Sequence, residues 1–202
     1  RLIGMTNHRF TMLDTQYRMH PAISVFPRAE FYKQALLNGP NVTTPAWHLP
    51  GSRSNSDAKE SALARIQDML ISVQSRPYTL INVAAGTERR AVESGSYENM
   101  VEAKLAVEVV VQTISTKQLK LRCEHADVRS VVVIAMYSAQ VKLIRTLLSR
   151  NSLMRNRQHS ADAPSVSVCS VDAFQGSEAD VMILSMVRAN QAGGVGFLAD
   201  RR

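Results

Sequence analysis

The chain of 202 residues contains several apolar runs with the composition of β-strands. Residues 131–137 are continuously apolar and rich in β-branched side chains, which is typical of a strand buried on both faces. Residues 166–171 and 181–187 form two further runs rich in Val and Ile, and shorter strand candidates lie at 10–14 and 78–84. The strongest strand signals therefore lie in the second half of the chain.

Other segments repeat their apolar residues with the helical period. Helices are expected over 21–32, 59–75 and 100–116, and a fourth is expected to begin at Ser138 as its N-cap. Pro27 should bend or interrupt the first of them. The side chains expected to face inward are Ile23, Phe26 and Phe31 in the first helix, Leu63, Ile66, Leu70 and Val73 in the second, Val101, Leu105, Val109 and Ile114 in the third, and Val141, Ile144 and Leu148 in the fourth.

Polar segments separate these elements. Residues 38–57 are rich in Pro, Gly, Ser and Asn, which predicts a long loop, and with the helix at 59–75 they form an expected insertion at 38–75. Residues 86–96 are a charged loop that ends in Ser96, a candidate N-cap of the third helix. Residues 150–164 are basic and poor in apolar side chains, so a loop is expected there as well.

Strands that alternate with helices predict an α/β fold with a mainly parallel sheet flanked by helices. In such folds ligands bind beyond the carboxyl ends of the strands. Polar groups follow four of the expected strands, so four separate segments are expected to converge at one edge of the sheet. They are 16–18, Ser138 with Gln140, 172–178, and Arg188 with Asn190.

Composition adds limited information about partners. The formal charge of +7 and the pI near 9.8 favour a polyanionic partner, although ordinary soluble domains also carry such an excess. Cys123 and Cys169 match no metal or redox spacing, which favours a reduced intracellular compartment, in the cytoplasm or nucleus. No run approaches the ~18 apolar residues of a membrane span, so no membrane partner is expected. Because the chain begins at Arg1 and stops at Arg202, it is expected to be a piece of a longer protein.

The expected edge has the chemistry of a phosphate site. Arg18 and Arg188 carry planar, permanently charged groups that suit phosphate oxygens, and Gly176 lets the backbone approach a ligand. Yet the chain contains no G-x-x-x-x-G-K-[ST] phosphate loop and no Asp, Glu or His cluster at metal-ligand spacing, so no metal site is expected. The chain could therefore complete a nucleotide site but could not build one alone.

Several segments resemble the motifs of superfamily 1 helicases of the nonsense-mediated-decay and senataxin-like group. The segment Gln16-Tyr-Arg-Met-His-Pro21 resembles motif IV. The segment Val171-Asp-Ala-Phe-Gln-Gly-Ser-Glu178 resembles motif V, and Ile183-Leu-Ser185 with Val187-Arg-Ala-Asn190 resembles the strand that follows it. Gly194-Val-Gly-Phe-Leu-Ala-Asp-Arg-Arg202 resembles the approach to motif VI, and Ser96, Asn99 and Glu102-Ala103 resemble the helix that links these motifs.

The resemblance implies that residues 1–202 are the second RecA-like domain of an ATP-driven translocase, ending before motif VI is complete. Such a domain has the fold of the phosphate-loop NTPases without the phosphate loop. The first RecA-like domain, which this chain lacks, would be its partner and would hold most of the ATP and Mg²⁺. This chain alone is then expected to be inactive.

The resemblance also implies roles for individual residues. Arg18 would reach the γ-phosphate as an arginine finger, a group worth about 10³ to 10⁵ in rate. The residues implied to contact the nucleotide or report its state are Gln16, Tyr17, Gln175, Gly176 and Glu178. Single-stranded RNA or DNA would be held without sequence preference by Tyr137, Ser138, Gln140, Ser170 and Val171.

The residues leave alternatives open. Arg18 could instead pair with Asp14 or Glu30 at the surface, Tyr17 could pack rather than stack on adenine, and Glu178 could cap a helix. For the whole chain, the leading hypothesis is a motor domain of an ATP-dependent RNA or DNA helicase. The main alternative is a non-catalytic helicase-like module that binds RNA or a protein. A free-standing mononucleotide enzyme is a third class, but it would need its own phosphate loop.

Overall fold

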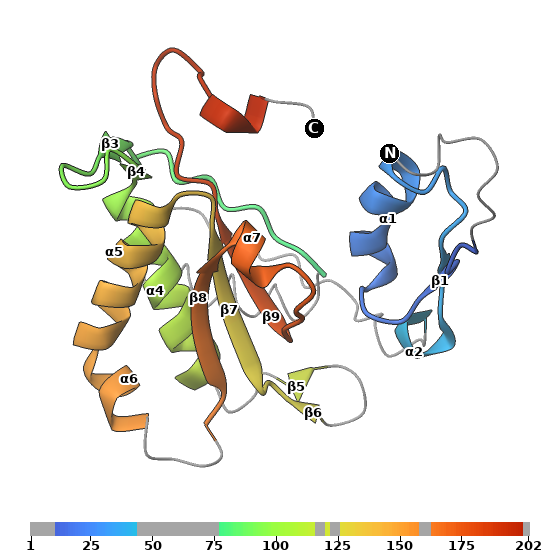
Figure 1. The fold of residues 1–202 in the computed structure, drawn as a ribbon. Helices are drawn as coiled ribbons and strands as arrows, with labels where there is room; N and C mark the ends of the chain where they lie inside the picture. Colours follow the sequence, from blue (N-terminus) through green and yellow to red (C-terminus); the bar gives the residue numbers. More distant parts are fainter. Residues whose placement is uncertain (1–10, 44–76, 116–119, 122–125, 158–162, 200–202) are drawn as a thin grey trace, which may run out of the picture.

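The fold is taken from a computed structural model that describes residues 11–43, 77–115, 120–121, 126–157 and 163–199 (Figure 1). A three-stranded sheet lies at its centre, in the order β8-β7-β9. The strand β7 (Ser130–Ala135) pairs in parallel with β8 (Ser165–Ser170) on one side and with β9 (Val181–Ser185) on the other. The predicted α/β fold with a parallel sheet is confirmed.

The central strand is buried on both faces, as its sequence predicts. Every residue from Val131 to Ala135 is buried. Because side chains alternate along a strand, Val131, Val133 and Ala135 face one way and pack into a core with Val168 of β8. The intervening side chains of β7 face the opposite way.

Two helices cover the first of these faces (Figure 1). They are α4 (Met100–Ser115) and α5 (Ser138–Arg150). In α5 the predicted inward residues Val141, Ile144 and Leu148 are all buried, which confirms the expected face. In α4, Val109 and Ile114 are buried as predicted, but Val101 is exposed. The main buried row of α4 is displaced from the expected one and runs through Ala103, Val107, Val110 and Ile114.

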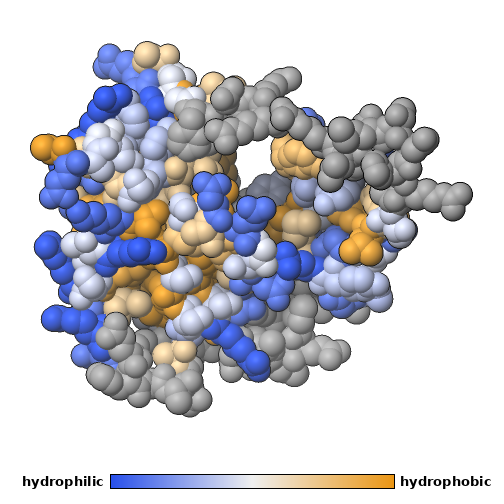
Figure 2. All heavy atoms as spheres, viewed as in Figure 1, coloured by the Kyte–Doolittle hydropathy of each residue, from blue (hydrophilic) through white to orange (hydrophobic). Residues whose placement is uncertain are grey.

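The opposite face of the sheet is less covered. Met182 and Leu184, which alternate with the core residues of β9, are 53% and 52% exposed. Figure 2, which has the same orientation as Figure 1, shows hydrophobic surface open to solvent between hydrophilic side chains. Apolar side chains thus remain accessible along this edge strand.

The starts of the two covering helices differ from the sequence prediction. The Oδ1 atom of Asn99 accepts a hydrogen bond from Glu102 N at 3.2 Å, so Asn99 rather than Ser96 caps α4. Ser138 does not cap α5, since the residue at the cap position is Tyr137, whose side chain makes no capping bond. Instead the Oγ atom of Ser96 accepts a hydrogen bond from Ala139 N at 3.3 Å. A cap predicted for one helix thus serves the other.

The N-terminal residues form a small unit beside the sheet (Figure 1). It comprises β1 (Thr15–Gln16), α1 (Pro21–Glu30), β2 (Leu37–Asn38) and α2 (Pro40–Thr43), with β1 and β2 paired in parallel. The strand predicted at 10–14 is wrong for residues 11–14, since pairing starts at Thr15.

The predicted inward face of α1 is also wrong. Phe26 and Phe31 are 66% and 71% exposed, Ile23 is exposed as well, and only Ser24 of the helix is buried. The reason is that α1 packs within this small unit and does not cover the sheet. Pro27 lies inside α1, and the helix ends at Glu30, before the predicted end.

Other predicted segments also differ. Residues 78–84 form no strand, because no neighbouring strand pairs with them in the described part of the chain. The charged loop contains a hairpin of β3 (Arg89–Arg90) and β4 (Tyr97–Glu98), and the basic loop contains α6 (Ser152–Arg157). A further short pair joins β5 (Lys120–Leu121) and β6 (Ala126–Asp127). The helix predicted at 59–75, and the insertion beyond residue 43, lie outside the described residues.

Among the residues that the structure describes, every helix falls short of the length and apolar content that crossing a bilayer requires.

The core between α5 and the sheet gives a stability prediction. Ile144 is fully buried, so Ile144→Ala should leave a cavity and lower the free energy of unfolding by about 2–5 kcal/mol. Val101→Ala, at an exposed position of α4, is the control and should change it by less than about 0.5 kcal/mol. Urea unfolding followed by circular dichroism measures both. Equal losses in the two variants would contradict the assigned core.

Candidate functional site

The carboxyl ends of the three parallel strands meet at one edge of the sheet. Ala135, the last residue of β7, pairs with Ser170 of β8 and with Ser185 of β9, which are also the last residues of their strands. The segments that follow the strands therefore start side by side. This register explains why polar residues distant in sequence gather here.

The segment after β8 turns directly into the short helix α7 (Val171–Phe174). The Oγ atom of Ser170 accepts a hydrogen bond from Ala173 N at 3.3 Å and caps this helix. After Gln175 the chain reverses at Gly176, whose φ of +84° is in the left-handed region that favours glycine. A Cβ at Gly176 would meet nothing within 4 Å, so the backbone conformation and not a lack of space calls for glycine.

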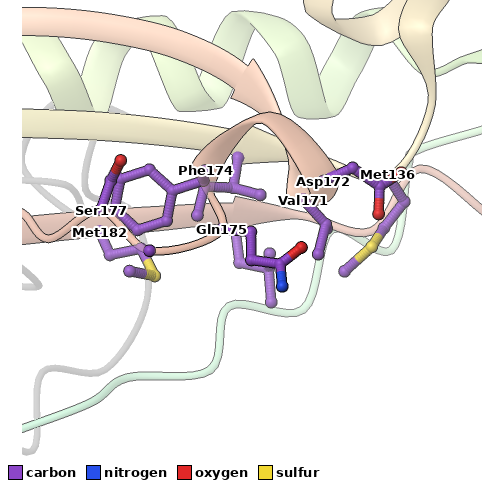
Figure 3. A pocket seen from close by; sticks show the side chains of 10 residues that line it. Met136, Val171, Asp172, Phe174, Gln175, Ser177 and Met182 are labelled. Atoms are coloured by element: carbon purple, nitrogen blue, oxygen red, sulfur yellow. The ribbon is translucent and has the colours of Figure 1, made fainter.

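A pocket of about 460 Å³ lies between α7 with its following turn and the less covered face of the sheet (Figure 3). Ile134, Met136, Met182 and Leu184 line it from the sheet side. The other lining residues come from α7 and its turn and are Val171, Asp172, Phe174, Gln175, Gly176 and Ser177. The pocket is thus mainly apolar, and Gln175 is among its few polar groups.

The N-terminal unit contacts the segment after α7 through one ion pair. The Nε atom of Arg18 donates to Oε2 of Glu178 at 2.8 Å, joining residues 160 positions apart in sequence. The two side chains are 60% and 70% exposed, so the pair contributes about 0–1 kcal/mol at most. Arg18 is therefore paired with neither Asp14 nor Glu30. Glu178 lies between α7 and β9 and caps no helix.

Gln16 fixes the turn that presents Tyr17 and Arg18. Its Oε1 atom accepts from Arg18 N at 3.0 Å and from Met19 N at 2.6 Å. Its Nε2 atom donates to Met19 O at 2.7 Å and to Asn38 Oδ1 at 2.8 Å. The Gln16 amide is thus engaged within the protein.

The Tyr17 ring is exposed, but it packs closely against Gly39, where a Cβ would collide with the ring. Packing on one side and stacking on a ligand are therefore both compatible with its position. His20 sets the start of α1, since its Nδ1 atom accepts from Ala22 N at 3.1 Å.

A second group of polar residues surrounds a partly buried ion pair that the sequence did not reveal. The Nε atom of Arg188 donates to Oε2 of Glu88 at 2.8 Å, and the side chains are only 13% and 11% exposed. The same oxygen accepts from Ala189 N at 2.8 Å and from Asn190 Nδ2 at 3.0 Å. Glu88 therefore fixes three consecutive residues after β9. It lies in the charged loop, where no pattern distinguished it from its neighbours.

The pKa values of this pair follow from its surroundings. Burial by itself would raise the pKa of Glu88, but the hydrogen bonds from Arg188, Asn190 and Ala189 N outweigh it and hold the pKa below its ordinary value. The hydrogen bond to Glu88 raises the pKa of Arg188 further. Both groups therefore stay charged at neutral pH.

Aromatic rings complete this group. The guanidinium of Arg188 lies 4.3 Å from the centre of the Tyr97 ring, and its Nη1 atom donates to the Tyr137 hydroxyl at 3.4 Å. The two rings pack edge to face with centres 5.5 Å apart. Gly196, with φ of +62°, lies so close that a Cβ there would collide with Arg188 Nη1. We call Glu88, Arg188, Tyr97 and Tyr137 the arginine cluster.

Beside the arginine cluster, buried amides link α4, α5 and β9. The Gln140 side chain accepts from Asn99 N at 2.8 Å and donates to Asn99 O at 3.1 Å and Ser185 Oγ at 3.0 Å. Ser185 Oγ donates to Glu102 Oε2 at 2.7 Å, which also accepts from Val187 N at 2.9 Å. Val187 is buried with φ of +73°, an uncommon conformation for a β-branched residue, and these bonds help to hold it.

The residues predicted to hold a nucleic-acid strand occupy two neighbouring strand ends. Ser138 and Val171 are exposed, and Ser170 is half-buried. Tyr137 and Gln140 are buried. Both polar ends of the Gln140 amide are bonded inside the protein, so this side chain supports the turn, and its contact with nucleic acid stays a prediction.

The four polar segments expected at one edge form two groups. Residues 16–18 meet 172–178 through the pair of Arg18 and Glu178. The turn at Ser138 meets the segment of Arg188 through the Tyr137 hydroxyl. Within the described ranges, no three His, Cys, Asp or Glu side chains come together in a way that could hold a metal ion.

Comparison with known proteins adds independent evidence. A family model described as an AAA domain matches residues 1–202. The Regulator of nonsense transcripts 1 homolog of Arabidopsis thaliana is 33% identical over 190 residues, which are 94% of this chain and 13% of that protein. The ATP-dependent helicase upf1 of Schizosaccharomyces pombe is 30% identical over 202 residues, or 100% of this chain and 18% of that protein.

The Probable helicase senataxin of Homo sapiens is 32% identical over 188 residues, which cover 93% of this chain and 6% of that protein. This chain therefore spans less than a fifth of the length of these curated relatives.

The lowered pKa of Glu88 predicts that the free energy of unfolding decreases as the pH falls into the acid range. A lowered folded-state pKa contributes stability above the ordinary value of 4.5, and this contribution is lost as the pH falls through the folded pKa. Glu88→Gln should therefore be less stable than the parent protein at neutral pH, and the difference should narrow in acid. Urea unfolding over a pH series measures it. Glu93→Gln, in a solvent-exposed pair with Lys142, is the control and should show a much smaller effect. A difference for Glu88→Gln that does not vary with pH would refute the assignment.

Proposed function

The chain belongs to the AAA-domain family and to the superfamily 1 helicases of the nonsense-mediated-decay and senataxin group, and on this basis we propose that it is their second RecA-like domain. The full-length protein would be an ATP-dependent helicase that moves along single-stranded RNA or DNA inside the cell. Its first RecA-like domain would supply the phosphate loop, which this sequence lacks.

The contact between Arg18 and Glu178 carries the proposal. It brings the segment that resembles motif IV to the segment that resembles motif V, and it leaves both side chains exposed to solvent. The first RecA-like domain, when it holds ATP, could therefore reach Arg18. Because an exposed pair contributes little stability, Arg18 can exchange the Glu178 carboxylate for a phosphate oxygen at small cost.

In the proposed site each residue has a distinct task. Arg18 stabilises the negative charge of the transferring phosphoryl group, and Gln16 holds the turn that aims it. Tyr17 offers the exposed part of its ring to the adenine. Gln175 and Gly176 lie in the turn before Glu178 and report the nucleotide state to α7. Mg²⁺, when bound with ATP in the first domain, neutralises charge on the phosphates.

The nucleic-acid path is proposed at the ends of β7 and β8. Ser138 and Val171 are exposed there, and Ser170 lies beside them on the neighbouring strand. Hydroxyl and backbone groups at these positions suit sugar and phosphate, which gives binding without sequence preference. Ser170 belongs to both functions, because it also caps the helix α7 that leads to the nucleotide segment.

The arginine-finger proposal predicts a separation of binding from hydrolysis. In the full-length protein, Arg18→Ala should lower the rate of ATP hydrolysis by about 10³-fold or more while changing nucleotide affinity little. Steady-state hydrolysis and titration with a fluorescent ATP analogue measure the two quantities. Arg89→Ala is a matched control, since Arg89 is 61% exposed and also pairs with a glutamate, Glu98. Equal losses of hydrolysis and binding in Arg18→Ala would reject the finger role.

A further prediction concerns the chain by itself. The purified 202-residue chain should show no ATP hydrolysis above a buffer blank, because it has no phosphate loop. Hydrolysis that persists through successive chromatographic steps would overturn the assignment as a second domain. If the full-length protein also fails to hydrolyse ATP in the presence of RNA or DNA, the non-catalytic binding module is the correct alternative.

A further inference from the structure

The arginine cluster lies next to the turn that is proposed to contact the nucleic acid. Tyr137 immediately precedes Ser138, the first residue of α5, and its hydroxyl accepts a hydrogen bond from Arg188. Arg188 is fixed by Glu88, which comes from a segment a hundred positions earlier in the chain. The position of the turn therefore depends on a partly buried ion pair formed by two other segments.

The hairpin of β3 and β4 also contacts this turn. Ser96, which precedes β4, accepts hydrogen bonds from Ala139 N and from Ser138 Oγ, both at 3.3 Å. Tyr97 packs its ring against Tyr137 and lies beneath the guanidinium of Arg188. The first residues of α5 thus have contacts to the hairpin through both backbone and side chains.

The segment after β9 is bound to the same guanidinium. Asn190 closes a turn with Gly194 through hydrogen bonds of 2.7 and 2.9 Å, and Gly196 then passes against Arg188 and the Tyr137 hydroxyl. This segment leads into the residues that resemble the approach to motif VI. The Arg188 side chain therefore contacts both the proposed strand-binding turn and the segment that leads into the residues resembling the approach to motif VI.

A buried ion pair is a poor means of gaining stability alone, because removing two charges from water offsets most of their attraction. The pair of Glu88 and Arg188 instead fixes geometry, since one carboxylate oxygen accepts three hydrogen bonds from successive residues. The arginine cluster is also outside the main apolar core, which consists of residues from α4, α5 and the sheet.

We propose that Glu88 and Arg188 are positioning residues that, together with the β3–β4 hairpin, hold the Tyr137–Ser138 turn in the conformation that binds single-stranded nucleic acid. The inference rests on the proposed function and extends it to residues with no assigned role. Neither Glu88 nor Arg188 touches the strand; both act through Tyr137. Neither residue belongs to the apolar core that packs against the sheet.

The test uses the full-length protein and fluorescein-labelled (U)15 and (dT)15, with affinity measured by anisotropy. Glu88→Gln keeps the shape of the side chain and removes its charge, and it should weaken binding by about 5- to 20-fold. Tyr137→Phe keeps the ring and removes the hydroxyl, and it should weaken binding by about 3-fold without loss of fold. Because both variants act through one contact, the double variant should lose less than the product of the two single losses.

A stability-matched control separates positioning from general destabilisation. Val110→Ala removes a fully buried core side chain and should lower the melting temperature while leaving strand affinity unchanged. Affinity losses that follow melting temperature across all variants, Val110→Ala included, would overturn the inference. So would unchanged affinity in both Glu88→Gln and Tyr137→Phe when the parent protein binds the strand.

Binding by the parent protein distinguishes failure of the proposed function from failure of the positioning role alone. If it binds neither oligonucleotide, the proposed function fails and the positioning role fails with it. If it binds and only the variants behave otherwise than expected, the proposed function stands and the positioning role alone is rejected.

Discussion

The structure depends on the burial of one strand. β7 is paired in parallel on both sides and is buried on both faces, so it fixes the relative position of every segment that follows the sheet. Because Ala135, Ser170 and Ser185 are in register, the turns after all three strands begin at the same edge. A parallel sheet thereby converts three distant stretches of sequence into one surface.

Polar side chains replace apolar packing at that edge. Gln140 and Asn99 are fully buried, and their hydrogen bonds tie α4, α5 and β9 together. An apolar contact would allow small shifts between these elements, whereas a bonded amide has preferred distances and directions. The bonds to Val187 also support its left-handed backbone. The edge is therefore held by buried hydrogen bonds where α5 begins, whereas α7 borders the pocket.

Two of the arginine–glutamate pairs show how burial separates two uses of the same chemistry. Arg18 and Glu178 are exposed, contribute little stability and can exchange partners. Arg188 and Glu88 are only 13% and 11% exposed, and breaking the pair would leave one partly shielded charge without its partner. An exchangeable pair suits a site that must accept a ligand. A permanent pair suits a contact that must keep its geometry.

The sequence by itself determined β7 and the inward face of α5, because each follows from the spacing of apolar residues along a single segment. The parallel α/β class followed from the alternation of strand and helix patterns along the chain. The motif segments could also be recognised in the sequence. The structure pairs Arg18 of one segment with Glu178 of another. Tertiary structure decided the rest. Within the part of the chain that the structure describes, residues 78–84 have strand composition but no pairing strand, and Phe26 has helical spacing but is 66% exposed. The pair of Glu88 and Arg188 leaves no local signal, because its partners are far apart in the chain and meet only after the sheet has formed.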